Sequence, residues 1–182
     1  MVMPADLIER ARRLRLLSCD VDGVLTDGRI YVDEDGRELK AYSSLDGLGM
    51  KMLERSGVTV AWITGSRSPA VAKRAANLGI EHVIQGAEDK FGAWQRLRST
   101  LSLFPEQCAH IGDDLPDLPI IVRCGFGATV PHSPEPLRLQ AHYVTRLDGG
   151  RGAVREVAEL ILAARGALDA MLRAYDVVER AS

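Results

Sequence analysis

The feature that most constrains this chain is an apolar run that ends in two aspartates spaced i, i+2. The run begins at Leu16, the aspartates are Asp20 and Asp22, and Gly23 follows them. Such a run predicts a buried strand, and a central strand of a parallel sheet opens at its carboxyl end onto the crevice where α/β proteins bind ligands. Side chains at i and i+2 leave a strand on the same side. Because two close carboxylates repel each other, the pair indicates bound Mg²⁺ or acid–base chemistry.

Two simpler interpretations of this pair are a calcium loop and a solvated strand end. An EF-hand calcium loop needs D-x-[DN]-x-[DN]-G and a distal glutamate, and it follows a helix. Here Val24 stands at the fifth position and Tyr31 at the twelfth, and the preceding residues are apolar. The calcium loop is therefore disfavoured, while the solvated strand end stays open at this point.

The rest of the chain alternates apolar strand patterns with helical ones, which predicts an α/β fold: a doubly wound, Rossmann-like parallel sheet with helices on both faces. We expect a single domain over residues 1–182, with a polar β-hairpin projecting at about 30–42 and a carboxyl-terminal tail or helix at about 149–182. The expected strands are residues 14–20, 58–63, 82–85, 108–112, 126–130 and 143–144, and the expected helices are residues 4–13, 46–56, 69–79, 89–101, 116–123 and 153 onward.

Composition narrows the function classes. A formal net charge of -2 gives no electrostatic footprint for nucleic acid, so we expect no nucleic-acid partner. No apolar run approaches the ~20 residues that span a bilayer, so we expect no membrane partner. The three cysteines lack C-x-x-C spacing and lie in apolar segments, which predicts free buried thiols and a cytoplasmic location.

The stretch from Asp20 to Asp27 matches D-x-D-G-[VT]-[LV]-[TS]-D at every position and resembles the first motif of the haloacid dehalogenase-type phosphotransferases. Later motifs of that family follow in order. They are Thr64 after the second strand, Lys90 after the third, and G-D-D-x-x-D at 112–117 after the fourth. In isolation Thr64 would be a turn residue and Lys90 a solvated lysine.

The resemblance implies a mechanism as well as a fold. Asp20 would form an aspartyl phosphate, and Asp22 would act first as an acid and then as a base. Thr64 would donate a hydrogen bond to the phosphoryl group, and Lys90 would neutralise the nucleophile and the phosphoryl oxygens. The implied cofactor is Mg²⁺, with Asp20, Asp22 and Asp113 as its ligands and Asp114 and Asp117 in support.

The segment between the first two motifs is filled by the hairpin and one helix, which leaves no room for an inserted cap domain. Residues 43–49 and 143–156 resemble the capless phosphatases of 3-deoxy-D-manno-octulosonate 8-phosphate, and this resemblance spans about residues 14–165. It implies hydrolysis of that phosphorylated sugar acid to the free acid and phosphate, in lipopolysaccharide biosynthesis. The implied substrate contacts are Asp22, Asp46, Gly47, Gly65, Arg74, Lys90 and Arg151.

Two positions depart from the octulosonate pattern. Lys51 and Ser66 stand where those enzymes commonly have arginines, and a point charge or a hydroxyl does not replace a bidentate guanidinium. A sialic-type nonulosonate 9-phosphate is therefore the alternative substrate. An alternative of another class is a non-catalytic oligomeric binding module, against which the intact motifs argue.

A capless crevice also raises the question of what closes it. A short hairpin, expected to be polar on both faces, is not stable when it projects alone. We therefore expect a homotetramer in which one subunit's hairpin closes another's site. The alternative is a monomer closed by its own tail, with residues 149–152 supplying flexibility.

Overall fold

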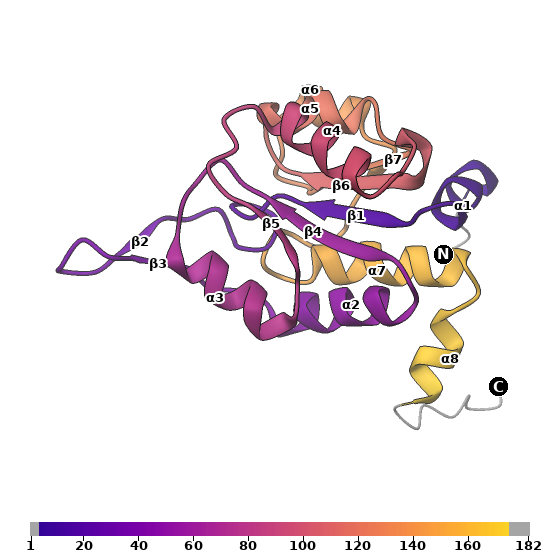
Figure 1. Cartoon of the computed structure of the whole chain (residues 1–182), viewed down its shortest axis with the longest axis horizontal. Helices are drawn as coiled ribbons and strands as arrows, with labels where there is room; N and C mark the ends of the chain where they lie inside the picture. Colours follow the sequence, from indigo (N-terminus) through magenta and orange to yellow (C-terminus); the bar gives the residue numbers. More distant parts are fainter. Residues whose placement is uncertain (1–3, 175–182) are drawn as a thin grey trace.

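The computed structural model describes residues 4–174, in which one six-stranded sheet lies between two layers of helices (Figure 1). Helices α2, α3 and α7 cover one face, and α4, α5 and α6 cover the other. The strands are β1 (Leu16–Cys19), β2 (Tyr31–Val32), β3 (Glu38–Leu39), β4 (Thr59–Ile63), β5 (His82–Ile84), β6 (Cys108–Gly112), β7 (Phe126–Thr129) and β8 (Tyr143–Val144). The helices are α1 (Ala5–Arg12), α2 (Ser44–Arg55), α3 (Pro69–Leu78), α4 (Lys90–Thr100), α5 (Leu118–Ile121), α6 (Glu135–Gln140), α7 (Ala153–Ala164) and α8 (Leu168–Arg173), with 3₁₀ turns η1 (Pro105–Gln107) and η2 (Leu115–Asp117).

The sheet is parallel throughout, with the order β5-β4-β1-β6-β7-β8. The chain builds outward from β1 to β5 on one side and then returns to start β6 on the other. The topological switch point therefore lies between β1 and β6, where doubly wound sheets bind their ligands. Cys19 stands opposite Ile111 in this pair of strands. The predicted fold class is confirmed.

Both faces of the central strand are buried, which explains its unbroken apolar pattern. Leu17 and Cys19 pack into the larger core cluster beneath α2 and α7, which includes Val157. Leu16 packs into the smaller cluster on the opposite face, which includes Trp94 of α4. Burial on both sides fixes β1 in place, so the residues that follow it leave the sheet from a rigid point.

The carboxyl-terminal helix is shorter than predicted. Helix α7 ends at Ala164 instead of continuing, because Gly166 adopts φ 70° and breaks the helix before α8 begins. The part of the expected tail beyond residue 174 lies outside the described residues. Helix α6 was not predicted, since six residues after Pro134 give little periodicity to detect. Among residues 4–174, no helix combines the length and apolar character needed to cross a membrane.

The glycine-rich segment 149–152 is firmly packed, so the prediction that its glycines make it flexible is wrong. The Gly150 N–H donates to the Val24 carbonyl at 2.9 Å. A Cβ atom on Gly149 would lie 1.8 Å from the Gly23 carbonyl oxygen. These glycines therefore permit close contact between two backbones, and the segment braces the loop that follows β1.

Strands β2 and β3 pair in antiparallel fashion and extend away from the body of the molecule (Figure 1). The hairpin was expected to be polar on both faces, and this is wrong. Ile30 is 78% exposed, Val32 61% and Leu39 58%. The projecting element thus presents apolar side chains to solvent.

Candidate active site

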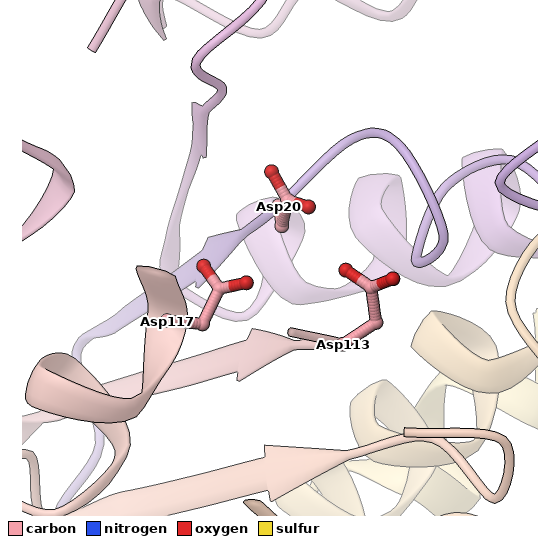
Figure 2. Close-up of side chains that lie close together, drawn as sticks. All are labelled: Asp20, Asp113 and Asp117. Atoms are coloured by element: carbon pink, nitrogen blue, oxygen red, sulfur yellow. The ribbon is translucent and has the colours of Figure 1, made fainter. Parts of the chain in front are cut away.

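Three carboxylates meet at the switch point of the sheet. Asp20 follows β1 directly, Asp113 follows β6, and Asp117 comes from η2. One oxygen of each lies within 4.8 Å of the other two, and Figure 2 shows the three side chains converging. The Asp20 N–H donates to the Ile111 carbonyl at 2.9 Å, which continues the β1–β6 ladder and aligns the two strand ends. The convergence of Asp20 and Asp113 was predicted.

This cluster carries an excess of negative charge. Burial and the charge of Asp117 raise the pKa of Asp20, against the opposing effect of Lys90. Burial and the nearby Asp20 raise the pKa of Asp113 to about 8. Crowded carboxylate oxygens with too few cations are the donor set that a hard divalent cation prefers. The residues therefore fit Mg²⁺.

Lys90 is the first residue of α4 and is buried at the centre of the cluster. Its Nζ lies 2.8 Å from Asp20 Oδ1 and 2.9 Å from Asp117 Oδ1, and its side chain is 8% exposed. Burial alone would lower the pKa of Lys90, but the charges of Asp20 and Asp117 outweigh it and raise the pKa. Lys90 is thus a charged bridge between two carboxylates, and its interpretation as a solvated lysine is wrong.

The carboxylate of Asp22 lies beside a second set of polar groups. Ser66 Oγ donates to Asp22 Oδ2 at 2.9 Å, and Thr64 Oγ1 lies 3.0 Å from the same Ser66 oxygen. Lys40 forms an ion pair with Asp22 Oδ1 and another with Glu38. The Asp22 side chain is 37% exposed, so it is open to solvent where Asp20 is not. Asp22 is thus placed to exchange protons. Asp22 was expected among the metal ligands, but the three carboxylates that converge are those of Asp20, Asp113 and Asp117.

The remaining predicted contacts divide into two sets. Asp46 is buried, and its carboxylate accepts the N–H groups of Gly152 at 3.3 Å and Arg155 at 2.8 Å. It therefore caps the amino terminus of α7, a role that was not predicted. Gly47 is also buried and lies against Arg74, since a Cβ there would meet Nη2 at 2.8 Å.

Three other positions lie nearer to solvent. The guanidinium of Arg74 stands over the Tyr42 ring at 6.0 Å from its centroid. Gly65 is exposed beside Thr64, and Arg151 is exposed on the segment that braces the loop after β1. Of these three residues, Gly65 directly follows Thr64 in the chain, and Gly65 and Arg151 are exposed whereas Arg74 is half-buried.

Two residues of the site were not predicted. Lys40 follows the projecting hairpin, where a lysine is ordinarily solvated, yet its side chain is 4% exposed. His110 lies within β6, and its Nε2 is 3.0 Å from Asp117 Oδ1. The hydrogen-bond partner of a single histidine in an apolar strand cannot be predicted from the sequence when that partner lies in a later turn.

Comparisons with known proteins agree with this geometry. The chain is 49% identical over 164 residues to the 3-deoxy-D-manno-octulosonate 8-phosphate phosphatase KdsC of Yersinia pestis, covering 90% of this chain and 88% of that protein. The chain belongs to the 3-deoxy-D-manno-octulosonate 8-phosphate phosphatase family. No protein-family model matches the chain.

Two crystal structures show that the fold of this octulosonate phosphatase family member is similar to theirs over nearly the whole chain. A probable YrbI family phosphatase from Pseudomonas syringae pv. phaseolica 1448a superposes with a TM-score of 0.93 at 49% identity, covering 97% of this chain and all of that one. The phosphatase of Moraxella catarrhalis, solved with magnesium, phosphate and KDO, gives a TM-score of 0.93 at 43% identity, covering 95% and 99%. A further similar structure, from Legionella pneumophila, is described as a hydrolase of the haloacid dehalogenase superfamily.

Proposed function

We propose that this chain is a Mg²⁺-dependent phosphomonoesterase that hydrolyses 3-deoxy-D-manno-octulosonate 8-phosphate to the free sugar acid and phosphate. The observation that carries the chemistry is the position of Asp20, held between Lys90 and Asp113 at the end of the central strand. The Yersinia pestis relative and the Moraxella catarrhalis complex support the sugar and the cation. Intact motifs in one site disfavour the non-catalytic module.

The proposed reaction proceeds in two displacements. A carboxylate oxygen of Asp20 attacks phosphorus, the sugar alkoxide leaves, and an aspartyl phosphate forms. Once the Lys40 ion pair opens, Asp22 takes up a proton from solvent and gives it to the leaving alkoxide. The Asp22 carboxylate then takes a proton from the water that hydrolyses the aspartyl phosphate. Asp20 is thereby regenerated and phosphate is released.

The other residues stabilise charge on the phosphoryl group. Lys90 neutralises the phosphoryl oxygens next to Asp20, and Thr64 donates a hydrogen bond to them. Asp113 and Asp20 would hold Mg²⁺, which supplies further positive charge at the same oxygens. We propose Gly65, Arg74 and Arg151 as contacts to the sugar acid, as the family resemblance implies; Gly65 and Arg151 are exposed, and Arg74 is half-buried beside Tyr42.

A substrate comparison tests the proposal. We expect kcat/KM for the octulosonate 8-phosphate to exceed that for a nonulosonate 9-phosphate by at least roughly tenfold, the lower end of the discrimination that a difference of one carbon unit provides. Removal of the metal with EDTA should abolish both activities, and Mg²⁺ should restore them. A preference for the nonulosonate would show that Lys51 and Ser66 redirect the specificity. Absence of turnover on both, with Mg²⁺ present, would refute the enzymatic proposal.

We also propose that the active unit is a homotetramer in which the hairpin of one subunit closes the crevice of another. The exposed Ile30, Val32 and Leu39 support this, because an isolated apolar hairpin is marginal in water. An inactive Asp20→Asn chain mixed with a chain lacking residues 33–38 should regain activity if hairpins act across subunits. A fully active monomer at assay concentration would rule the assembly out.

We further propose that one hydrolase domain over residues 1–182 carries the whole activity and that it acts in the cytoplasm. The three cysteines are free and buried, which supports a reducing compartment.

A further inference from the structure

A buried chain of polar groups leads from the interior of the sheet to the proposed nucleophile. His110 Nε2 lies 3.0 Å from Asp117 Oδ1, and that same oxygen lies 2.9 Å from Lys90 Nζ. Lys90 Nζ then reaches Asp20 Oδ1 at 2.8 Å. His110 and Asp117 are both fully buried. The proposed mechanism makes no use of His110, although it contacts the oxygen that anchors Lys90.

Hydrogen-bond donors and acceptors fix the orientation of the imidazole ring. Asp117 Oδ1 accepts a hydrogen bond from Lys90 Nζ at 2.9 Å, because an ammonium group can only donate. A carboxylate has no hydrogen to donate, so the His110 nitrogen that faces it, Nε2, carries the proton. At the other end of the ring, Nδ1 lies 2.9 Å from Ser18 Oγ.

The sheet itself places these groups together. Ser18 and His110 are direct neighbours across the β1–β6 pair, so their side chains share one face of the sheet. Asp117 comes from η2 after β6, and Lys90 starts α4, which covers the same face. His110 is therefore held at both ends, by Ser18 and by Asp117, before any substrate arrives.

The simpler interpretation is a core histidine that merely satisfies its own hydrogen bonds. Against it stands the sharing of one oxygen, since His110 and Lys90 both donate to Asp117 Oδ1. Loss of the His110 donor would free that carboxylate to rotate or to take up a proton. Lys90 would then lose its second anchor, and its position against Asp20 would loosen.

We propose that His110 is a positioning residue for phosphoryl transfer: it fixes Asp117, and Asp117 holds Lys90 against Asp20. This inference rests on the proposed roles of Asp20 and Lys90. It predicts that the donor at the Nε2 position matters for turnover, whereas the contact at the Nδ1 position matters little.

A matched pair of variants separates the two ends of the ring. The amide nitrogen of His110→Gln can occupy the Nε2 position, whereas that of His110→Asn reaches only the Nδ1 position. We expect kcat of His110→Gln to stay within a few-fold of wild type and kcat of His110→Asn to fall roughly 10- to 100-fold, the usual effect of such supporting contacts. Vanadate resembles the five-coordinate phosphorus, so its inhibition constant should rise with the loss of kcat, while KM changes little.

Two further variants keep the inference testable if a histidine variant does not fold, as judged by its thermal unfolding midpoint. Ser18→Ala should leave kcat nearly unchanged, because it removes the Nδ1 contact and a hydrogen bond to the Ala109 carbonyl but leaves the Nε2 donor in place. Asp117→Asn should reduce kcat, and His110→Asn added to it should cause no further loss, because both act through one oxygen. Equal losses in His110→Gln and His110→Asn, a large loss in Ser18→Ala, or additive losses would overturn the inference. Absence of wild-type turnover on every phosphomonoester, p-nitrophenyl phosphate included, would instead refute the proposed function.

Discussion

The surroundings of Asp113 raise the pKa of its carboxyl group to near neutral pH. Its pKa of about 8 lies above the value of 3.8 for a free aspartate, because of burial and the neighbouring Asp20. Between these values the folded protein binds more protons than the unfolded chain. Through this group, the free energy of unfolding of the metal-free protein falls as pH rises from about 4 to about 8.

Bound Mg²⁺ should offset this loss, since the cation replaces the proton on Asp113. We expect the increase in unfolding midpoint at a fixed Mg²⁺ concentration to grow between pH 6 and pH 8 and then to level off. Calorimetry with and without Mg²⁺ across this range measures it. In Asp113→Asn the increase should be smaller and should depend less on pH, because only Asp20 still exchanges a proton for the cation. Equal stabilisation of the wild type at pH 6 and pH 8 would show that Asp113 is no ligand.

Asp20→Asn keeps the shape of the proposed nucleophile and removes its charge. Turnover of the octulosonate phosphate should fall by several orders of magnitude, roughly 10⁴-fold or more. The variant should fold, because the Asp20 main chain still donates to Ile111. Steady-state kinetics with Mg²⁺ measure the loss, and near-wild-type turnover by the folded variant would refute nucleophilic attack by Asp20.

The sequence allowed the central residues of the site to be predicted, because carboxyl ends of parallel strands share one edge. Asp20 and Asp113 follow such strands directly, Lys90 begins the helix after another, and the structure brings the three together. The capping role of Asp46 was not predicted, since a carboxylate at a helix start looks the same whether it binds a ligand or caps a distant helix. The burial of Lys40 and its ion pair with Asp22 depend on how the hairpin folds back, which no local sequence pattern predicts.

At the scale of elements, buried strands were predictable and helix ends were not. Strand β6 matches its predicted bounds, because apolar runs flanked by turn residues identify a doubly buried strand. The break at Gly166 was missed, since one glycine in a helical pattern is often tolerated. The role of residues 149–152 was also missed, because close packing of two backbones leaves no periodic pattern.

Gly149→Ala tests that packing. The added Cβ would lie 1.8 Å from the Gly23 carbonyl oxygen, so one backbone must move. We expect the free energy of unfolding to fall by roughly 1–3 kcal/mol, as for other overpacked sites, and kcat to fall as the loop beside Asp20 shifts. Denaturant unfolding and steady-state kinetics measure the two effects.

Gly57→Ala is the matched control for stability. Gly57 has φ 80° and follows the end of α2, and a Cβ atom added there would meet no other atom within 4 Å. Its cost should be about 1–2 kcal/mol from backbone strain, with kcat unchanged. If Gly149→Ala also kept full kcat, the packing of residues 149–152 against the loop after β1 would have no effect on the active site.

At the scale of the whole molecule, the projecting hairpin decides whether the chain assembles. Ile30→Lys together with Val32→Lys should shift a tetramer towards smaller species and reduce activity, because two charges would enter an apolar contact. Leu139→Lys on α6 is the control, since Leu139 is 75% exposed and Ile30 is 78% exposed. Light scattering measures the mass of each. Equal dissociation by both variants would place the interface elsewhere.

Because residues 149–152 brace the loop after β1, that loop can reach its final position only late in the synthesis of the chain. The last residue of the acidic motifs is Asp117, so a nascent chain carries every proposed reacting group well before the ribosome adds Gly149 and Gly150. Until then, the Val24 carbonyl lacks the donor that Gly150 N–H supplies in the folded protein. A chain that terminates before residue 149 would contain every motif of the family. It would still lack the backbone that holds the loop after β1 in place.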